Sequence, residues 1–282
     1  MTIEISRLTQ GFVKGAKRTQ VQSVEIGYRG PVCGRHWMPV GPDGKFLLSD
    51  EYPVITFIQP RIEVGKLVLE SPLMPKDVAV PITDKGPRIF VTMFTKKMVF
   101  EAVVDTKASD WIQTITNVDG AMLVHLPQDI VRTDGRGVAE LGLADSSSMS
   151  LSLEESLVDL NGRIKQNGHE PVSWERFGHD LWVKGTDAYQ EDAWAEIIIG
   201  EKRFAVIKPI ERCARTLIRR EAKILTERKK KDREPLDTLA QYRRLKNGKT
   251  IFGQKVAHLG KGEIRVGDKV KVVDYKDFPE LR

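Results

Sequence analysis

The stretch around which the rest of the chain is organised is Phe204-Ala205-Val206-Ile207-Lys208-Pro209-Ile210-Glu211-Arg212-Cys213. Its apolar beginning predicts a β-strand that stops at Pro209, since proline cannot donate a backbone hydrogen bond. Cys213 follows this strand, and Arg212 and Arg215 lie beside it in the sequence. Nearby cations favour the thiolate, the form that attacks an electrophile or binds a metal. The alternative is an inert, half-buried cysteine, because free cysteines are often buried.

The bulk composition limits the classes of protein. The 282 residues, 40% of them hydrophobic, suffice for one large domain or two ordinary ones. Lysine and arginine exceed aspartate and glutamate by 45 to 39, and the resulting net charge is +6. This charge suits an anionic cofactor, an acidic protein partner or nucleic acid, and it selects none of them.

Cysteine usage and apolar runs indicate the compartment. No apolar run approaches the roughly 20 residues that cross a bilayer, and the N-terminus lacks the pattern of a signal peptide. With only two cysteines, Cys33 and Cys213, we expect a cytoplasmic protein. Because the chain contains no CxxC motif, we expect neither an iron–sulfur cluster nor a structural zinc site.

Short apolar runs separated by turns fill the first 105 residues and predict a barrel or sandwich rather than a parallel α/β sheet. Helical spacing of apolar residues appears at 153–166, and a short helix is predicted at 236–245. The polar loop 132–137 is a natural boundary between two modules. The fold class expected is therefore β-rich α+β, with domains at 1–128 and 129–282.

Two basic regions are candidate binding sites. Lys14, Lys17, Arg18 and Arg35 lie in or near glycine-rich loops, where cations and free backbone can hold a phosphate. The charged segment 219–234, with the basic run 229–233, suits an acidic protein or nucleic acid, although it lacks aromatic residues for base stacking. For both regions the alternative is ordinary solvated surface.

Familiar catalytic motifs are missing from the sequence. It contains no Walker loop, no GxGxxG, no GxSxG and no HExxH. The five histidines are scattered, and His179 is the best placed to pair with Cys213, because such partners need be close only in space. A surface histidine is the alternative for that residue.

Six motifs nevertheless occur in an order typical of one family. They are Glu155-Ser156-Leu157-Val158-Asp159-Leu160-Asn161, Glu191-Asp192-Ala193-Trp194, Arg212-Cys213, Glu234-Pro235-Leu236-Asp237-Thr238-Leu239, Phe252-Gly253-Gln254 and Val266-Gly267-Asp268-Lys269-Val270. The set resembles MOSC-domain molybdenum-cofactor proteins of the amidoxime-reducing component type. The resemblance covers nearly the whole chain, and it implies a MOSC N-terminal β-barrel domain at 1–128 followed by a MOSC β-barrel domain with a few helices at 129–282.

The resemblance also implies a cofactor and its site. The cofactor would be molybdenum–molybdopterin, with Cys213 as catalytic residue and metal ligand beside the two sulfurs of the pterin dithiolene; soft thiolates suit such a metal. Lys14 and Arg35 fall on the residues that hold the pterin phosphate. The remaining cofactor-binding residues implied by the family motifs or by compensating charge are Ser147, Arg176, Asp180, Arg212 and Lys255.

Several positions depart from the family pattern. Gly178 replaces a cofactor-contacting arginine, Asp180 an asparagine and Arg219 an aspartate; Gly15 replaces a serine, and Asp50 stands where the family has a basic residue. Loss of one arginine–phosphate contact costs about 1.5–3 kcal/mol. Cations such as Lys255 or Arg215 could offset it.

The resemblance implies an oxidoreductase that reduces small N-hydroxylated compounds. Because the chain has no cysteines for a cluster of its own, it would need an external electron donor such as a ferredoxin or a flavin/haem reductase, which the basic run 229–233 could dock. Membrane attachment and pyridoxal phosphate are not expected. A cofactor carrier or sulfur-transfer protein using a Cys213 persulfide is the first alternative, and a nucleic-acid binder is the least favoured.

Overall fold

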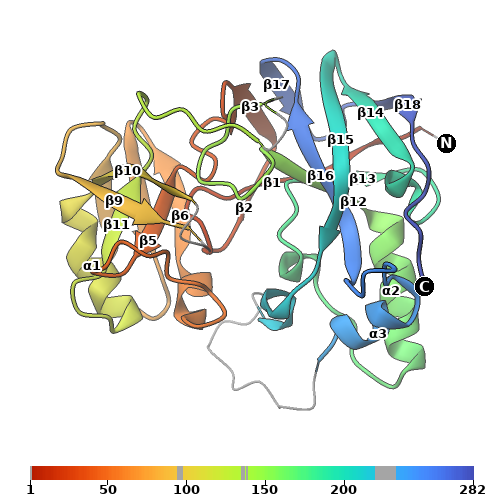
Figure 1. The fold of residues 1–282 in the computed structure, drawn as a ribbon, viewed down its shortest axis with the longest axis horizontal. Helices are drawn as coiled ribbons and strands as arrows, with labels where there is room; N and C mark the ends of the chain where they lie inside the picture. The colour runs from red at the N-terminus through yellow and green to blue at the C-terminus, as the bar shows by residue number, and fades with distance from the viewer. Residues whose placement is uncertain (1, 94–97, 135–136, 138, 220–232) are drawn as a thin grey trace.

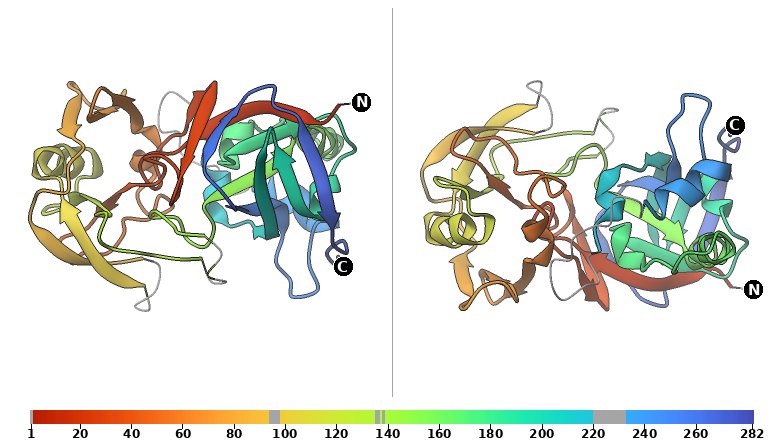
Figure 2. Two further views of the ribbon diagram at one scale, coloured as in Figure 1. Left: turned by 90° about the horizontal axis from the view of Figure 1, so that it is seen from above. Right: turned by 90° about the horizontal axis from the view of Figure 1, so that it is seen from below.

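The computed structural model describes residues 2–93, 98–134, 137, 139–219 and 233–282. The chain forms two β-rich lobes that lie side by side (Figure 1), and Figure 2 shows the same arrangement from above and from below. The expected β-rich α+β fold is confirmed. No helix in the described ranges combines the length and the apolar character needed to cross a membrane.

The second lobe is built on an eight-stranded sheet with the strand order β18-β14-β15-β16-β12-β13-β1-β2. Its strands are β1 (Glu4–Gln10), β2 (Thr19–Val21), β12 (Met149–Leu153), β13 (Leu181–Lys184), β14 (Trp194–Ile199), β15 (Lys202–Glu211), β16 (Ile251–His258) and β18 (Val270–Tyr275). The backbone N–H of Ile5 donates to Asp268 O at 2.9 Å, and that of Val270 donates to Ile3 O at 2.8 Å. These bonds tie β1 to the start of β18, so the sheet curls towards a closed barrel around a buried apolar core.

The first lobe holds two smaller sheets. One contains β5 (Trp37–Val40), β9 (Arg88–Thr92), β10 (Val99–Val104) and β11 (Met122–His125); the other contains β6 (Gln59–Glu63), β7 (Lys66–Glu70) and β8 (Val78–Pro81). Helix α1 (Thr106–Thr116) and the 3-10 turn η1 (Pro53–Phe57) pack beside them. Trp111 and Ile112 of α1 are buried in the core of this lobe.

A third, small sheet joins the two ends of the chain. Strand β17 (Gly262–Arg265) pairs with β3 (Ser23–Gly27), which pairs with β4 (Gly30–Pro31). Together with β1 and β2, these strands attach the first 31 residues to the second lobe. The division of the chain at residue 128 stays a prediction, because its first strands belong to a sheet of the second lobe.

Helices cover one side of the second lobe (Figure 1). They are α2 (Glu154–Gln166), α3 (Leu236–Tyr242) and the 3-10 turns η2 (Trp174–Arg176), η3 (Gln190–Asp192) and η4 (Ala214–Leu217). In α2, Leu157, Leu160 and Ile164 are buried at helical spacing, as the sequence predicts. Acidic residues lie in its first turn and basic residues in its last, which complements the helix dipole.

Strand β15 does not stop at Pro209, so that prediction is wrong. The strand continues to Glu211, and Pro209 lies opposite Gln254 of β16. The register shifts between Val206 and Lys208 and again between Pro209 and Glu211. Such irregularities accommodate a residue that cannot donate to the ladder, and they carry the strand to the edge of the site described next.

Candidate functional site

A cavity of about 390 Å³ lies where the first residues of the chain meet the end of β15. It is lined by the loop 11–18, by Arg35, and by residues of β12, β15, β16 and the turns near them. Eight of the lining side chains are cationic and two are acidic: Lys14, Arg18, Arg35, Arg176, Lys208, Arg212, Arg215 and Lys255, against Asp145 and Glu211. Such a wall attracts anions.

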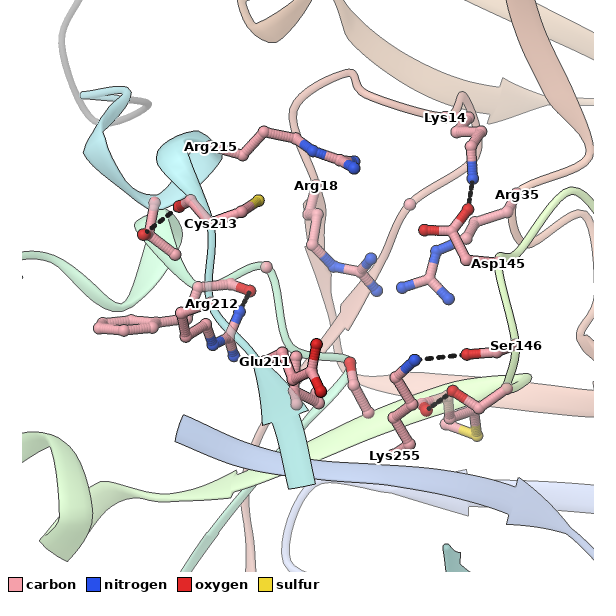
Figure 3. Close-up of a pocket in the computed structure, with 18 of the residues that line it drawn as sticks. Lys14, Arg18, Arg35, Asp145, Ser146, Glu211, Arg212, Cys213, Arg215 and Lys255 are labelled. Carbon is pink, nitrogen blue, oxygen red and sulfur yellow. Dashed lines mark hydrogen bonds and ion pairs between the residues drawn. The ribbon is translucent and has the colours of Figure 1, made fainter. Parts of the chain in front are cut away.

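Cys213 stands on this wall with its sulfur turned towards the cavity (Figure 3). Its side chain is exposed. Its carbonyl oxygen accepts hydrogen bonds from the Thr216 N–H at 3.0 Å and the Thr216 Oγ1 at 2.8 Å, which fix the backbone at the start of η4. Cys33, by contrast, is half-buried, and burial together with Glu25 raises the pKa of its thiol. Cys213 is therefore the accessible sulfur.

Asp180 holds two of the cavity's cations from behind. Its buried carboxylate pairs with the Arg18 guanidinium, with the Arg35 Nη2 at 3.3 Å and with the Ser150 Oγ at 2.6 Å. Arg18 also donates from Nε to the Thr9 Oγ1 at 2.8 Å. In Figure 3 the two guanidiniums extend into the middle of the cavity. Asp180 itself is not among the lining residues, so the structure places it as a support for the arginines.

Lys14 and Asp145 form an ion pair on the wall of the cavity opposite Cys213 (Figure 3). Lys14 is only 6% exposed and also donates to the Leu143 carbonyl at 2.9 Å. Burial lowers its pKa to about 8, against the opposing effect of Asp145. Although burial alone would raise the pKa of Asp145, Lys14, Arg215 and Arg35 hold it below its ordinary value. While Lys14 is protonated, this pair adds no net charge to the wall.

Ser146 and Ser147 lie in the loop before β12, and their hydroxyls already have partners within the protein. The Ser147 hydroxyl lines the cavity but donates to the Met149 carbonyl at 3.0 Å. Lys255 donates to the Ser146 hydroxyl. Burial and the neighbouring Lys208 lower the pKa of Lys255, while acidic neighbours oppose them. A bound anion would have to compete with Ser146 for the Lys255 ammonium.

The Arg212 guanidinium points into the protein. It donates to the carbonyl oxygens of Phe177 at 3.0 Å and Phe252 at 2.8 Å, and to the His179 Nε2 at 2.7 Å. Burial, followed by Arg212 and the two cavity arginines, holds the pKa of His179 well below its ordinary value. His179 is thus a buried neutral acceptor that fixes Arg212, rather than a base paired with Cys213.

The structure brings seven of the eight predicted site residues to one cavity. They are Lys14, Arg35, Ser147, Arg176, Arg212, Cys213 and Lys255. Of the basic-loop cations singled out in the sequence, Arg18 also lines the cavity and Lys17 does not. Sequence reasoning left out Lys208, although it lies in the strand that leads to Cys213. Among the departures from the family pattern, Gly15 and Gly178 line the cavity, whereas Asp50 and Arg219 are exposed elsewhere.

The basic run 229–233 falls mostly outside the described residues, because only Arg233 of the five is described. That residue lies in an exposed i,i+4 pair with Asp237 at 3.1 Å.

The chemistry of the cavity fits a metal cofactor with an anionic tail. An exposed thiol supplies a soft ligand, and guanidiniums held in fixed positions supply fork-shaped donors for a phosphate. The described lining residues include few carboxylates that would repel such a group.

Two known domain families match this chain. The MOSC N-terminal beta barrel domain matches residues 3–119, and the MOSC domain matches residues 139–271. A mitochondrial amidoxime-reducing component 1 from Xenopus laevis is 27% identical over 96% of this chain and 82% of its own length. A mitochondrial amidoxime reducing component 2 from Rattus norvegicus is 28% identical over 93% of this chain and 80% of its own.

A third relative is matched over a smaller part of its own length. A molybdenum cofactor sulfurase from Arabidopsis thaliana is 27% identical over 80% of this chain but only 30% of its own length. The two domain matches together span most of the sequence and follow the order that the motifs predict. The chain belongs to the MOSC-domain proteins that carry a MOSC N-terminal beta barrel domain.

Proposed function

We propose that this protein binds a molybdenum–molybdopterin cofactor in the cation-lined cavity, with Cys213 as the protein ligand of the metal, and that it reduces N-hydroxylated compounds. One observation carries the proposal: an exposed thiol lies on the wall of a cavity whose charged lining is mainly arginine and lysine. The name of the amidoxime-reducing relative supports the reaction, and that of the cofactor-sulfurase relative supports the cofactor.

The chain's own residues have separable roles in this proposal. Arg18 and Arg35 would bind the phosphate, because Asp180 keeps their guanidiniums in place before any ligand arrives. Arg215 would add positive charge beside Cys213 (Figure 3). The Lys14–Asp145 pair would close the opposite wall. When bound, the molybdenum supplies the two-electron chemistry that removes the oxygen atom.

The reaction needs electrons from another molecule. Reduction of an N–OH group to N–H consumes two electrons and two protons and releases one water. The chain's two cysteines are too few for an iron–sulfur cluster held by four thiolates. The donor would therefore be external, such as a ferredoxin or a flavin/haem reductase. We propose that this donor docks on the basic run 229–233, and the support for this is the positive charge of that run in the sequence.

The test is to purify the protein from cells that make the cofactor and to measure molybdenum and pterin per chain, then turnover of an amidoxime with a reduced dye. We expect about one molybdenum per chain and turnover by the wild type, and loss of turnover in Cys213→Ala. A wild-type preparation free of molybdenum and pterin, or equal activity in the variant, would overturn the proposal.

A second function has its own support. The cofactor-sulfurase relative and the exposed position of Cys213 favour a carrier or a sulfur-transfer protein. In the sulfur-transfer case, the Cys213 thiolate would take the outer sulfur from a donor persulfide, which would leave as a thiolate, and the Cys213 persulfide would be detected as a mass increase of one sulfur atom that a reductant removes. The cofactor would then be released reversibly, and amidoximes would not be turned over.

A further inference from the structure

A second cluster of potential metal ligands lies in the first lobe, away from the lining of the cavity. His36 directly precedes β5, His125 ends the neighbouring β11, and Asp84 lies in the segment between β8 and β9. One ligand atom from each lies within 4.8 Å of the other two. The absence of CxxC led us to expect no structural zinc, but these three residues are distant in sequence and only the fold brings them together.

His125 has the environment of a ligating histidine. Its side chain is 2% exposed, and its Nδ1 lies 2.9 Å from the Asp105 Oδ2. In the neutral tautomer whose Nδ1–H donates to Asp105, the lone pair lies on Nε2. This buried Nε2 has no hydrogen-bond partner, and it lies 3.5 Å from the Asp84 Oδ1. A carboxylate on one ring nitrogen is the usual outer partner of a histidine whose other nitrogen binds a metal.

The other two residues are also held in place. The Asp84 Oδ2 accepts a hydrogen bond from the Gln128 N–H at 2.9 Å, and Oδ1 faces the histidine. The His36 ring stacks on the His125 ring with 5.3 Å between centroids. The backbone N–H of His36 donates to Phe12 O at 3.0 Å.

We propose that His36, Asp84 and His125 bind one divalent transition-metal ion, with Asp105 orienting His125. Two imidazoles and one carboxylate are a ligand set that suits zinc, with a water completing the tetrahedron. The present separations are wider than in an occupied site, so the three ligand atoms would have to move closer together to bind the ion. His36 adjoins Arg35, so the ion would tie the backbone that carries this cavity arginine to the sheet of the first lobe.

The test is titration of the purified full-length protein with Zn²⁺ against a chromophoric chelator, and with Co²⁺ followed by its visible spectrum. We expect one saturable ion with no thiolate-to-cobalt band. Asp84→Asn and His125→Gln should each weaken binding at least about tenfold, and Asp105→Asn by about 10–100-fold. Asp84→Asn keeps an acceptor for Gln128, so this variant is expected to fold.

A matched control is His169→Ala, which removes a half-exposed histidine near α3 and should leave zinc affinity unchanged. Three results would overturn the proposal. They are the absence of saturable binding, affinity unchanged in folded Asp84→Asn and His125→Gln, or a thiolate band that disappears in Cys213→Ser and so places the ion in the cavity. None of these readouts depends on molybdenum, so the outcome is separate from that of the proposed function.

Discussion

Among single residues, Asp180 shapes the cavity from outside its lining, because its buried carboxylate holds Arg18 and Arg35. In the pattern that the sequence resembles, an arginine stands at the position of Gly178 and an asparagine at that of Asp180. The two changes together lower the positive charge at this wall by two. Arg18 and Arg35 share one fixed anionic partner before a ligand binds.

Asp180→Asn should lower the free energy of unfolding, because it leaves the buried Arg18 guanidinium without its anionic partner. The Arg18 side chain is 8% exposed, and removing the partner of a buried charge costs about 3–5 kcal/mol. Sulfate should restore part of this loss by pairing with the freed guanidiniums. The measurement is urea unfolding with and without sulfate. Asp237→Asn, which breaks an exposed pair, should cost at most about 1 kcal/mol and show no extra sulfate effect. An equal sulfate gain in wild type and Asp180→Asn would contradict this role.

Lys14 should make sulfate binding depend on pH. Its pKa in the folded protein is about 8, so it loses its proton as the pH rises past that value. Asp145 then faces the cavity as an unpaired carboxylate and repels the anion. We expect affinity to fall between pH 7 and pH 9 by up to about tenfold, since the protonated fraction falls about tenfold per pH unit above the pKa. Isothermal titration checks this; a dependence that persists in Lys14→Met would assign it to another group.

Sequence reasoning could predict the role of a residue where its immediate sequence neighbours indicate that role. Cys213 follows a strand and an arginine, and both are visible in one stretch. The role of Asp180 as the anionic partner of Arg18 and Arg35 could not be predicted from its sequence neighbours, because its partners lie far from it in the sequence. The same holds for His125, whose neighbours are brought together by strand pairing.

At the scale of elements, a glycine in β16 makes room for the His179 ring behind the cavity. Gly253 has φ +74°, and a Cβ built there would lie 2.3 Å from the His179 ring and 2.6 Å from the Leu151 carbonyl. The close approach lets His179 lie beside the strand and fix Arg212. Local patterns placed α2 well, whereas the extension of β15 past Pro209 follows from its pairing with β16 and was not visible in the sequence.

Gly253→Ala should be strongly destabilising. The left-handed backbone costs about 1–2 kcal/mol with any side chain, and the overlap with a packed ring adds about 1–3 kcal/mol. Gly248→Ala is the matched control, because its φ is +85° but no atom lies within 4 Å of the added Cβ. Thermal or urea unfolding should give a clearly larger loss for Gly253→Ala. Equal losses would show that the ring contact is unimportant.

At the scale of the whole molecule, the first strand belongs to the second lobe. Ile5 and Leu8 of β1 are fully buried in the core of the large sheet, and the loop that follows carries Lys14 and Arg18 to the cavity. The chain therefore assembles its site from residues 11–35 and residues 145–255. Periodicity predicted the β-rich class, but it could not show that β1 crosses to the other lobe.

A fragment of residues 129–282 should fail to fold on its own, because it lacks β1 and leaves the edge of β13 unpaired. We expect no cooperative unfolding of this fragment by circular dichroism. Attaching residues 2–10 through a flexible linker should restore a cooperative transition. If the bare fragment unfolds with the same midpoint as the intact protein, the two lobes are independent and β1 is dispensable.

The most direct test of the account is X-ray absorption at the molybdenum edge, on protein purified from cells that make the cofactor. The account predicts three sulfur neighbours of the metal in the wild type, one of them from Cys213, and two in Cys213→Ser. The same sulfur count in both proteins would contradict Cys213 as a ligand, and absence of molybdenum from the folded wild type would contradict the proposed cofactor itself.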